Sequence, residues 1–209
     1  MTKALLIIDV QNDFCPLGAL AVPKGDEVVP VINNLMKTFF KNDWLVVGTQ
    51  DWHPAGHGSF ASTNKATPFT MGVLGDLPQV MWPDHCVQDS NGAEFNPDLL
   101  DIPTIFQKGL DPTVDSYSGF FDNGGKNDSG LNKYLKDAGV TKVYICGLAT
   151  DYCVKFTALD AVKLGYQTFV IRDACRGVDY PVGSVDAAID EMRNAGVLIV
   201  DLLIDKFNP

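Results

Sequence analysis

The sequence has no long hydrophobic run and no excess of basic residues. The apolar stretch near its start, residues 4–8, ends at Asp9 and is far shorter than the ~20 residues that a membrane span requires. It is also too short for the core of a signal peptide. There are 16 basic and 26 acidic residues, the formal net charge is -10, and no local basic cluster offsets it. These absences predict a soluble, cytoplasmic protein that binds neither membranes nor nucleic acid.

Cysteine and histidine are scarce as well. The five cysteines are odd in number, widely spaced and form no C-x-x-C pair, so neither a disulfide framework nor a zinc finger is indicated. A site that requires imidazole must use His53, His57 or His85. The G-x-G-x-x-G, G-x-x-x-x-G-K-[ST] and G-x-S-x-G motifs are absent, which argues against a dinucleotide cofactor, a P-loop and a serine nucleophile.

Short apolar runs alternate with predicted helices along the chain. The runs cover residues 4–8, 44–48, 104–106, 142–146, 167–171 and 197–200, and the helices cover 27–41, 131–138, 151–164 and 182–194. Runs that are apolar on both faces and separated by helices are typical of parallel strands covered on both sides. We therefore predict an α/β fold with a parallel six-stranded sheet and helices on both of its faces.

Residues 50–102 interrupt this alternation. The segment is rich in Gly, Pro, Asp and Asn and is poorly periodic. A loop of that length inside a compact domain is usually functional. No repeat, low-complexity tract or linker divides the chain, and the alternation resumes after the segment, so we predict a single domain over residues 1–209.

Chemically useful side chains follow four of the predicted strands. Asp9 follows the first strand, Asp51 and His53 the second, Lys108 the third and Cys153 the fourth. Ligands of open α/β sheets bind beyond the carboxyl ends of the strands. The sequence therefore predicts that a carboxylate, a potential metal pair, an ammonium and a thiol meet at one edge of the sheet.

Cys153 is a candidate nucleophile. It lies in the predicted first turn of a helix, which we expect Thr150 or Asp151 to cap, and free amides and the helix dipole there favour a thiolate. A thiol needs a base, and a carboxylate such as Asp9 beside the ammonium of Lys108 can stay ionised when partly buried. The alternative is structural, because isolated cysteines are commonly buried small hydrophobes and lysines are commonly solvated.

Asp51 and His53 are candidate metal ligands. If the backbone is extended, side chains two residues apart point to the same side. Oxygen and imidazole ligands suit zinc, manganese or iron without selecting one, and segment 82–86 can supply a third ligand. His57 has three possible roles: it can ligate the metal, contact a metal-bound water or brace the loop. The structural alternative for Asp51 and His53 is a surface hydrogen bond.

Three aromatic residues lie in loops near these motifs. Phe14, Trp82 and Tyr117 can form the walls of a pocket for a flat aromatic substrate. Core packing or loop anchoring is the alternative for each of them.

The chain resembles the bacterial nicotinamidases of the isochorismatase-like cysteine hydrolases. The matching segments are Ile8-Asp9-Val10-Gln11-Asn12-Asp13-Phe14, Asp51-Trp52-His53-Pro54, His57-Gly58-Ser59-Phe60-Ala61, Trp82-Pro83-Asp84-His85-Cys86-Val87, Lys108-Gly109, Asp115-Ser116-Tyr117-Ser118 and Gly147-Leu148-Ala149-Thr150-Asp151-Tyr152-Cys153, with weaker similarity at Asp173-Ala174-Cys175-Arg176-Gly177. The likeness therefore covers nearly the whole chain. The segments Asp51-Trp52-His53 and Asp84-His85-Cys86 narrow the resemblance from the broad superfamily to the nicotinamidases.

The resemblance implies a Rossmann-like, three-layer fold and a set of site residues. Asp9, Lys108 and Cys153 would be catalytic, Asp51, His53 and His85 would hold one divalent metal ion, and the amides of Ala149 and Cys153 would form the oxyanion hole. The family also has a cis peptide bond before the residue that matches Ala149. Its branches differ in whether a histidine in the loop of His57 reaches the metal.

The activity that the resemblance implies is hydrolysis of the small molecule nicotinamide to nicotinate and ammonia through a cysteine thioester, as part of NAD salvage and without an organic cofactor. Another amide, or the enol ether of isochorismate, is an alternative substrate within the same superfamily. A non-catalytic metal-binding or small-molecule-binding module is an alternative from a different class. The sequence leaves open whether the protein is a monomer or a homo-oligomer.

Overall fold

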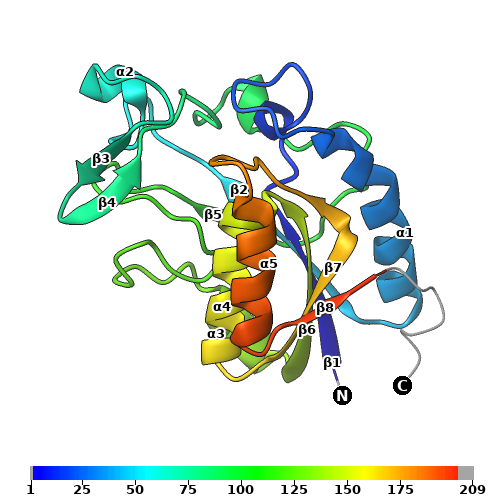
Figure 1. The fold of residues 1–209 in the computed structure, drawn as a ribbon. Coiled ribbons are helices and arrows are strands. Elements are labelled where there is room, and N and C mark those ends of the chain that lie inside the picture. Colours follow the sequence, from blue (N-terminus) through cyan, green and yellow to red (C-terminus); the bar gives the residue numbers. More distant parts are fainter. Residues whose placement is uncertain (1, 202–209) are drawn as a thin grey trace.

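The computed structural model describes residues 2–201, which form a central sheet between helices (Figure 1). The six strands of this sheet are β1 (Thr2–Ile8), β2 (Leu45–Asp51), β5 (Ile105–Lys108), β6 (Val140–Leu148), β7 (Gln167–Arg176) and β8 (Leu198–Val200). Their order is β5-β2-β1-β6-β7-β8, and every neighbouring pair is parallel. The carboxyl ends of all six strands therefore lie at one edge.

Helices cover both faces of the sheet. The helix α1 (Val28–Lys41) packs on one face, and α3 (Leu131–Asp137), α4 (Lys155–Lys163) and α5 (Ser184–Asn194) pack on the other (Figure 1). In α1, Ile32, Met36 and Phe39 recur at helical spacing and are fully buried, while Pro30 occupies the first turn, where no intrahelical N–H is needed. The predicted fold class, a single three-layer α/β domain, is confirmed.

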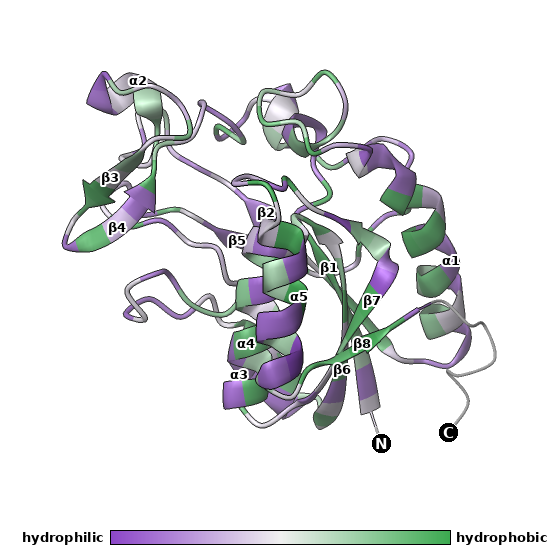
Figure 2. Ribbon diagram, viewed as in Figure 1, coloured by the Kyte–Doolittle hydropathy of each residue, from purple (hydrophilic) through white to green (hydrophobic). Residues whose placement is uncertain are grey.

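The strands contribute a large part of the hydrophobic core. Residues 4–8 of β1 are at most 1% exposed, because this strand is central in the sheet and helices cover it on both sides. Hydrophobic residues are concentrated along the strands, and polar residues lie on the outer faces of the helices (Figure 2). This arrangement explains why the strands are continuous apolar runs rather than alternating ones.

The long segment after β2 contains more regular structure than the sequence indicated. It holds a short helix α2 (Ala61–Asn64), an antiparallel hairpin of β3 (Met71–Leu74) and β4 (Leu77–Val80), and a turn of 3₁₀-helix at Asn91–Ala93. The hairpin was missed because two of its apolar side chains point to solvent: Met71 and Val73 are both 65% exposed. Isolated parallel bridges from His53 to Val87 and from Phe60 to Trp82 fix the segment in place.

Two boundaries differ from the prediction in ways that affect the site. Asp51 and Lys108 are the last residues of β2 and β5 rather than the first residues after them. The helix predicted at 151–164 is two elements, a π-helical turn at Thr150–Val154 followed by α4. In both cases the site residues lie within a strand or a helical turn rather than in a loop.

Candidate active site

Asp9, Lys108 and Cys153, here called the strand-end trio, lie together beyond three strand ends. The Nζ atom of Lys108 is 3.0 Å from Oδ2 of Asp9 and 3.5 Å from Sγ of Cys153. All three residues are buried, with exposures of 0% for Asp9, 4% for Lys108 and 7% for Cys153. They meet because β5, β2, β1 and β6 are consecutive in the sheet and end at the same edge. The structure thus brings the predicted thiol, carboxylate and ammonium together.

The hydrogen bonds of the trio leave one carboxylate oxygen of Asp9 free. Thr49 donates its hydroxyl to Oδ1 of Asp9 at 2.6 Å. Lys108 donates to Oδ1 of Asp51 at 2.9 Å, to the carbonyl of Ser116 at 2.8 Å and to Sγ of Cys153. An ammonium has only three protons, so Oδ2 of Asp9 forms an ion pair with Lys108 but accepts no hydrogen bond from it. That free oxygen is available for the thiol proton of Cys153.

The electrostatics of the trio favour a neutral thiol rather than the thiolate that the sequence suggested. Burial raises the pKa of Cys153 well above its ordinary value, and Asp9 and Asp51 raise it further, against the opposing effect of Lys108. Burial also raises the pKa of Asp9, with Lys108 acting in the opposite direction. The thiol proton of Cys153 therefore has the carboxylate of Asp9 beside it as an acceptor, both at rest and during the reaction.

The predicted helix cap is wrong. Neither Thr150 nor Asp151 caps the helix with its side chain, and Ala149 occupies the cap position. The carboxylate of Asp151 instead accepts hydrogen bonds from the amides of Val178 and Asp179. Asp151 therefore holds the loop after β7 against the site, which the local sequence pattern could not indicate. The Leu148–Ala149 peptide is cis, as the resemblance implies.

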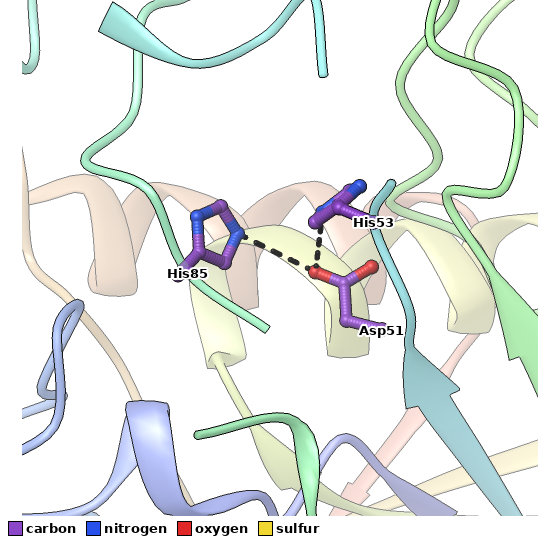
Figure 3. A group of neighbouring side chains, drawn as sticks. All are labelled: Asp51, His53 and His85. Atoms are coloured by element: carbon purple, nitrogen blue, oxygen red, sulfur yellow. Dashed lines mark hydrogen bonds and ion pairs between the residues drawn. The ribbon is translucent and has the colours of Figure 1, made fainter. Parts of the chain in front are cut away.

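A second group of side chains, Asp51, His53 and His85, lies beside the trio and could hold a metal ion. Oδ2 of Asp51 is 3.0 Å from Nε2 of His53 and 3.5 Å from Nε2 of His85 (Figure 3). One ligand atom from each of the three residues lies within 4.8 Å of the others, and all three are buried. We call these residues the Asp-His-His group.

Backbone carbonyls orient both imidazoles of this group. Nδ1 of His53 donates to the carbonyl of Gly109 at 3.0 Å, and Nδ1 of His85 donates to that of Pro83 at 2.7 Å. Nε2 of each ring is thereby left as the atom that faces Asp51, which is the arrangement that metal-binding histidines require. Gly109 is constrained, because its φ is +70° and a Cβ there would lie 2.4 Å from Cε1 of His53. The donor set fits a divalent ion.

Asp51 connects the two groups. Burial alone would raise the pKa of Asp51, but His53 and Lys108 hold it well below its ordinary value, so this residue stays anionic and could serve as a metal ligand. Gln11 holds the backbone of Asp51 by accepting from its amide at 2.8 Å and donating to its carbonyl at 2.7 Å. One oxygen of Asp51 faces the histidines and the other faces Lys108.

His57 is placed as a brace for its loop. Its Nδ1 accepts from the amide of Ser59 at 3.1 Å, and its Nε2 donates to the carbonyl of Asp111 at 2.9 Å. Burial and the neighbouring His53 lower the pKa of His57, which keeps the ring neutral. Nitrogens of His53 and His57 also lie near an oxygen of Asp115. These three residues form a second buried group that could hold a metal ion.

The predicted aromatic residues line one pocket together with Cys153 of the trio and with Asp51 and His85 of the Asp-His-His group. Phe14, Trp82 and Tyr117 are wall residues, and Nε1 of Trp82 donates to the hydroxyl of Tyr117 at 3.1 Å. The complete lining consists of Phe14, Leu20, Asp51, Trp82, His85, Asp115, Tyr117, Ala149, Tyr152, Cys153 and Val178. A narrow pocket with aromatic walls, a thiol and two imidazoles nearby suits a small flat ring.

Sequence reasoning missed several residues that support this pocket. Thr49 orients Asp9, while Asp115, Tyr152 and Leu20 line the cavity. Thr49 and Leu20 carry no local signal, because each looks like an ordinary strand or loop residue. Asp115 and Tyr152 lie inside segments that carried the family resemblance, and that was the available signal.

The comparisons with known proteins place the chain in a family. The isochorismatase domain family matches residues 3–202. The chain belongs to the isochorismatase family. This isochorismatase-family chain is 50% identical to the nicotinamidase of Escherichia coli (strain K12) over 202 residues, which cover 96% of this chain and 95% of that protein.

Solved structures of family members superpose closely on this chain. A nicotinamidase/pyrazinamidase from Acinetobacter baumanii has a TM-score of 0.90 and 45% identity, with 96% of each chain covered. The pyrazinamidase of Pyrococcus horikoshii in complex with zinc has a TM-score of 0.81 and 39% identity, with 97% of this chain and 100% of that chain covered. None of the helices described in residues 2–201 has the length and apolarity needed to cross a membrane.

Proposed function

We propose that this chain is a nicotinamidase that converts nicotinamide to nicotinate and ammonia through a thioester on Cys153, as a cytoplasmic step of NAD salvage. The observation that carries the proposal is the position of Lys108. Its Nζ atom contacts the carboxylates of Asp9 and Asp51 and the sulfur of Cys153 at once, so the strand-end trio and the Asp-His-His group form one site. The 50% identity to a bacterial nicotinamidase supports the choice of substrate.

The pocket would bind nicotinamide as a flat ring between its aromatic walls. Phe14 and Trp82 supply apolar surface, and Cys153 lies in the same lining. A divalent ion held by Asp51, His53 and His85 would supply a Lewis-acid anchor for the ring nitrogen, and zinc, manganese and iron all suit these donors. Fixing the ring in this way orients the carboxamide toward the sulfur, which a free thiol in solution cannot do.

In the first half-reaction, the free Oδ2 of Asp9 takes the thiol proton of Cys153 as the sulfur attacks the carboxamide carbon. The amides of Ala149 and Cys153 receive the developing oxyanion, and one such donor is typically worth ~3 kcal/mol. Asp9 then donates the proton to the departing nitrogen. Ammonia leaves, and the acyl group stays on sulfur as a thioester.

In the second half-reaction, the carboxylate of Asp9 removes a proton from water, which attacks the thioester carbon. The carbon–sulfur bond breaks, the proton on Asp9 returns to Cys153, and the carboxylic acid product loses its remaining proton to solvent and leaves as nicotinate. Lys108 stays protonated throughout, because burial would lower its pKa but the nearby Asp51 and Asp9 raise it well above its ordinary value. Its fixed charge balances the carboxylates on either side.

The test is an assay of ammonia and nicotinate release from nicotinamide by the purified protein. Acid quenching during turnover followed by mass spectrometry should reveal a nicotinoyl adduct on the peptide that contains Cys153. The matched control is Cys153→Ala, which should release ammonia at the background rate and carry no adduct. Turnover of isochorismate or another amide without turnover of nicotinamide would assign a different substrate, and equal rates for the two proteins would exclude a covalent role for Cys153.

A further inference from the structure

The catalytic pocket adjoins a second cavity. This cavity is a groove of about 470 Å³ between the β3–β4 hairpin, the start of α4 and the loop after β7. Among the described residues, only Tyr117 and Tyr152 line both the pocket and the groove. We call these two side chains the tyrosine partition, because they lie between the two cavities.

Contacts from both cavities hold the partition in place. The ring centroids of Tyr117 and Tyr152 lie 5.6 Å apart in an edge-to-face arrangement. Tyr152 packs edge-on against Trp82 of the pocket wall, with centroids 4.8 Å apart, and Tyr117 packs against Phe156 of the groove wall at 5.3 Å. The hydroxyl of Tyr152 donates to the carbonyl of Tyr180 at 2.8 Å. Aromatic pairs at these separations attract each other, so the partition is a defined wall.

The groove is open to solvent and has apolar walls. Met71 of the hairpin, Phe156 of α4 and Val182 of the loop after β7 line it, and Val182 is 92% exposed. Two of its charged wall residues, Lys155 and Glu191, pair with each other at 3.0 Å. The groove therefore suits an apolar group, which would gain by leaving water there.

The partition lies at the sulfur end of the catalytic pocket. Tyr152 directly precedes Cys153 in the chain, so the Cα atoms of the two residues are about 3.8 Å apart. Within residues 2–201, Asp51 and His85, which we propose to anchor the ring through a metal ion, line the pocket but not the groove. The groove therefore adjoins the carboxamide end of a bound substrate rather than its ring-nitrogen end.

We propose that Tyr152 is a specificity-determining residue that restricts the substrate to primary carboxamides by closing the pocket to the groove. The inference rests on the proposed function and names its substrate class. An apolar group on the amide nitrogen would collide with the tyrosine partition, and such an amide is rejected. Without the ring of Tyr152, the groove would receive that group. The chemistry would be the same: the carbon–nitrogen bond breaks, Asp9 protonates the nitrogen, and an amine leaves in place of ammonia.

The experiment measures kcat/KM for N-benzylnicotinamide and for nicotinamide, with release of nicotinate as the common readout. In Tyr152→Ala we expect the ratio of the first to the second to rise about tenfold or more above that of the parent, since steric fit in a pocket discriminates by at least this factor. Tyr152→Phe is the matched control. It keeps the ring, loses only the hydrogen bond to Tyr180, and should keep the parent ratio.

A second substitution tests whether the groove itself receives the benzyl group. Ala187 is an exposed residue of α5 that lines the groove, so Ala187→Trp can fill this space without disturbing the core. Added to Tyr152→Ala, it should return the ratio toward the parent value. In the parent background it should leave nicotinamide hydrolysis unchanged.

An unchanged ratio in folded Tyr152→Ala overturns the inference. So does a gain that survives Ala187→Trp, or an equal gain for a nicotinamide with a phenyl group on its ring, because either would mean that the pocket had only widened. Tyr152→Leu is the second variant in case the first does not fold. If neither folds, rejection of N-benzylnicotinamide by the parent supports the inference and its rapid turnover overturns it. A parent that hydrolyses neither amide would instead contradict the proposed function.

Discussion

The two halves of the site are built from different kinds of structure. The strand-end trio comes from consecutive parallel strands, whose register fixes where each strand ends. The Asp-His-His group takes Asp51 from a strand, but His85 comes from the irregular segment after β2 and is held by a single carbonyl contact and by its neighbours. The trio is therefore positioned by the core of the fold, and His85 by local bracing.

The difference suggests how each half should respond to change. Loss of a strand-end side chain removes a group from a fixed frame and leaves its partners unpaired in the core. Loss of a loop contact lets one ligand move while the frame stays intact. Lys108 belongs to both halves, because it bridges Asp9 and Asp51. The predictions below separate these cases.

The largest effect is expected for Lys108→Met, which removes the bridge. Two buried carboxylates, Asp9 and Asp51, would lose their cation, and breaking a buried ion pair in this way costs about 3–5 kcal/mol of folding stability. We expect urea unfolding to show that loss and nicotinamide hydrolysis to fall by about three orders of magnitude. A stable, active variant would show that the two halves do not depend on Lys108.

Removal of the metal ion should affect the Asp-His-His group and leave the strand-end trio largely unchanged. Dialysis against a chelator is expected to lower nicotinamide hydrolysis about a hundredfold or more and added zinc or manganese to restore it, because the ring loses its anchor. The trio should remain assembled, so the rate of alkylation of Cys153 by iodoacetamide should change much less. Elemental analysis before and after dialysis is the control. Full activity in metal-free protein would contradict the prediction.

A hydrogen bond that holds the irregular segment after β2 should affect the affinity for the metal ion. Asp13 accepts the amide of Cys86 at 2.7 Å and so fixes the backbone next to His85. We expect Asp13→Ala, which removes the acceptor, to weaken metal binding about tenfold, within the range typical of partners that orient ligands. Competition with a fluorescent chelator measures this affinity. An unchanged affinity would mean that His85 is held without this contact.

The smallest effect is expected from Thr49→Val, which removes the hydrogen bond that Thr49 donates to Asp9. Burial raises the pKa of Asp9, and the hydrogen bond from Thr49 opposes that rise, so its loss raises the pKa further. Asp9 must be ionised to accept the thiol proton, and the acidic limb of the kcat/KM profile should therefore move to higher pH. A lost hydrogen bond of about 1 kcal/mol corresponds to about a fivefold lower rate.

The matched control for Thr49→Val is Thr49→Ser, which keeps the hydroxyl. It should retain the parent pH profile even if the lost methyl group lowers stability slightly. A shift of the profile in both variants, or in neither, would argue that Thr49 does not orient Asp9.

Much of the fold could be predicted because its signals are local. Each strand contains a short apolar run, and α1 and α4 show helical spacing, so six strands and four helices were found within a few residues of their true limits. The hairpin of β3 and β4 could not be predicted, because Met71 and Val73 are exposed and its strands show no clear buried apolar face.

The candidate site also contains residues that could be predicted from local signals and roles that could not. Asp9, Lys108 and Cys153 could be nominated because each follows a recognisable strand and parallel strands end at one edge. The capping role expected of Thr150 or Asp151 was wrong, because the carboxylate of Asp151 finds its partners 27 and 28 residues away in sequence. The thiolate that the helix position favours is opposed by burial, which raises the pKa of Cys153 and depends on the whole fold.

The sequence by itself determined which residues alternate between strand and helix, and which reactive side chains follow the strands, because both depend on neighbours in the chain. Only the tertiary structure decided that β5, β2, β1 and β6 are consecutive, that His57 braces a loop and that Asp115 lines the same cavity as Cys153. Those properties depend on distances between residues far apart in sequence and on the water that the folded chain excludes.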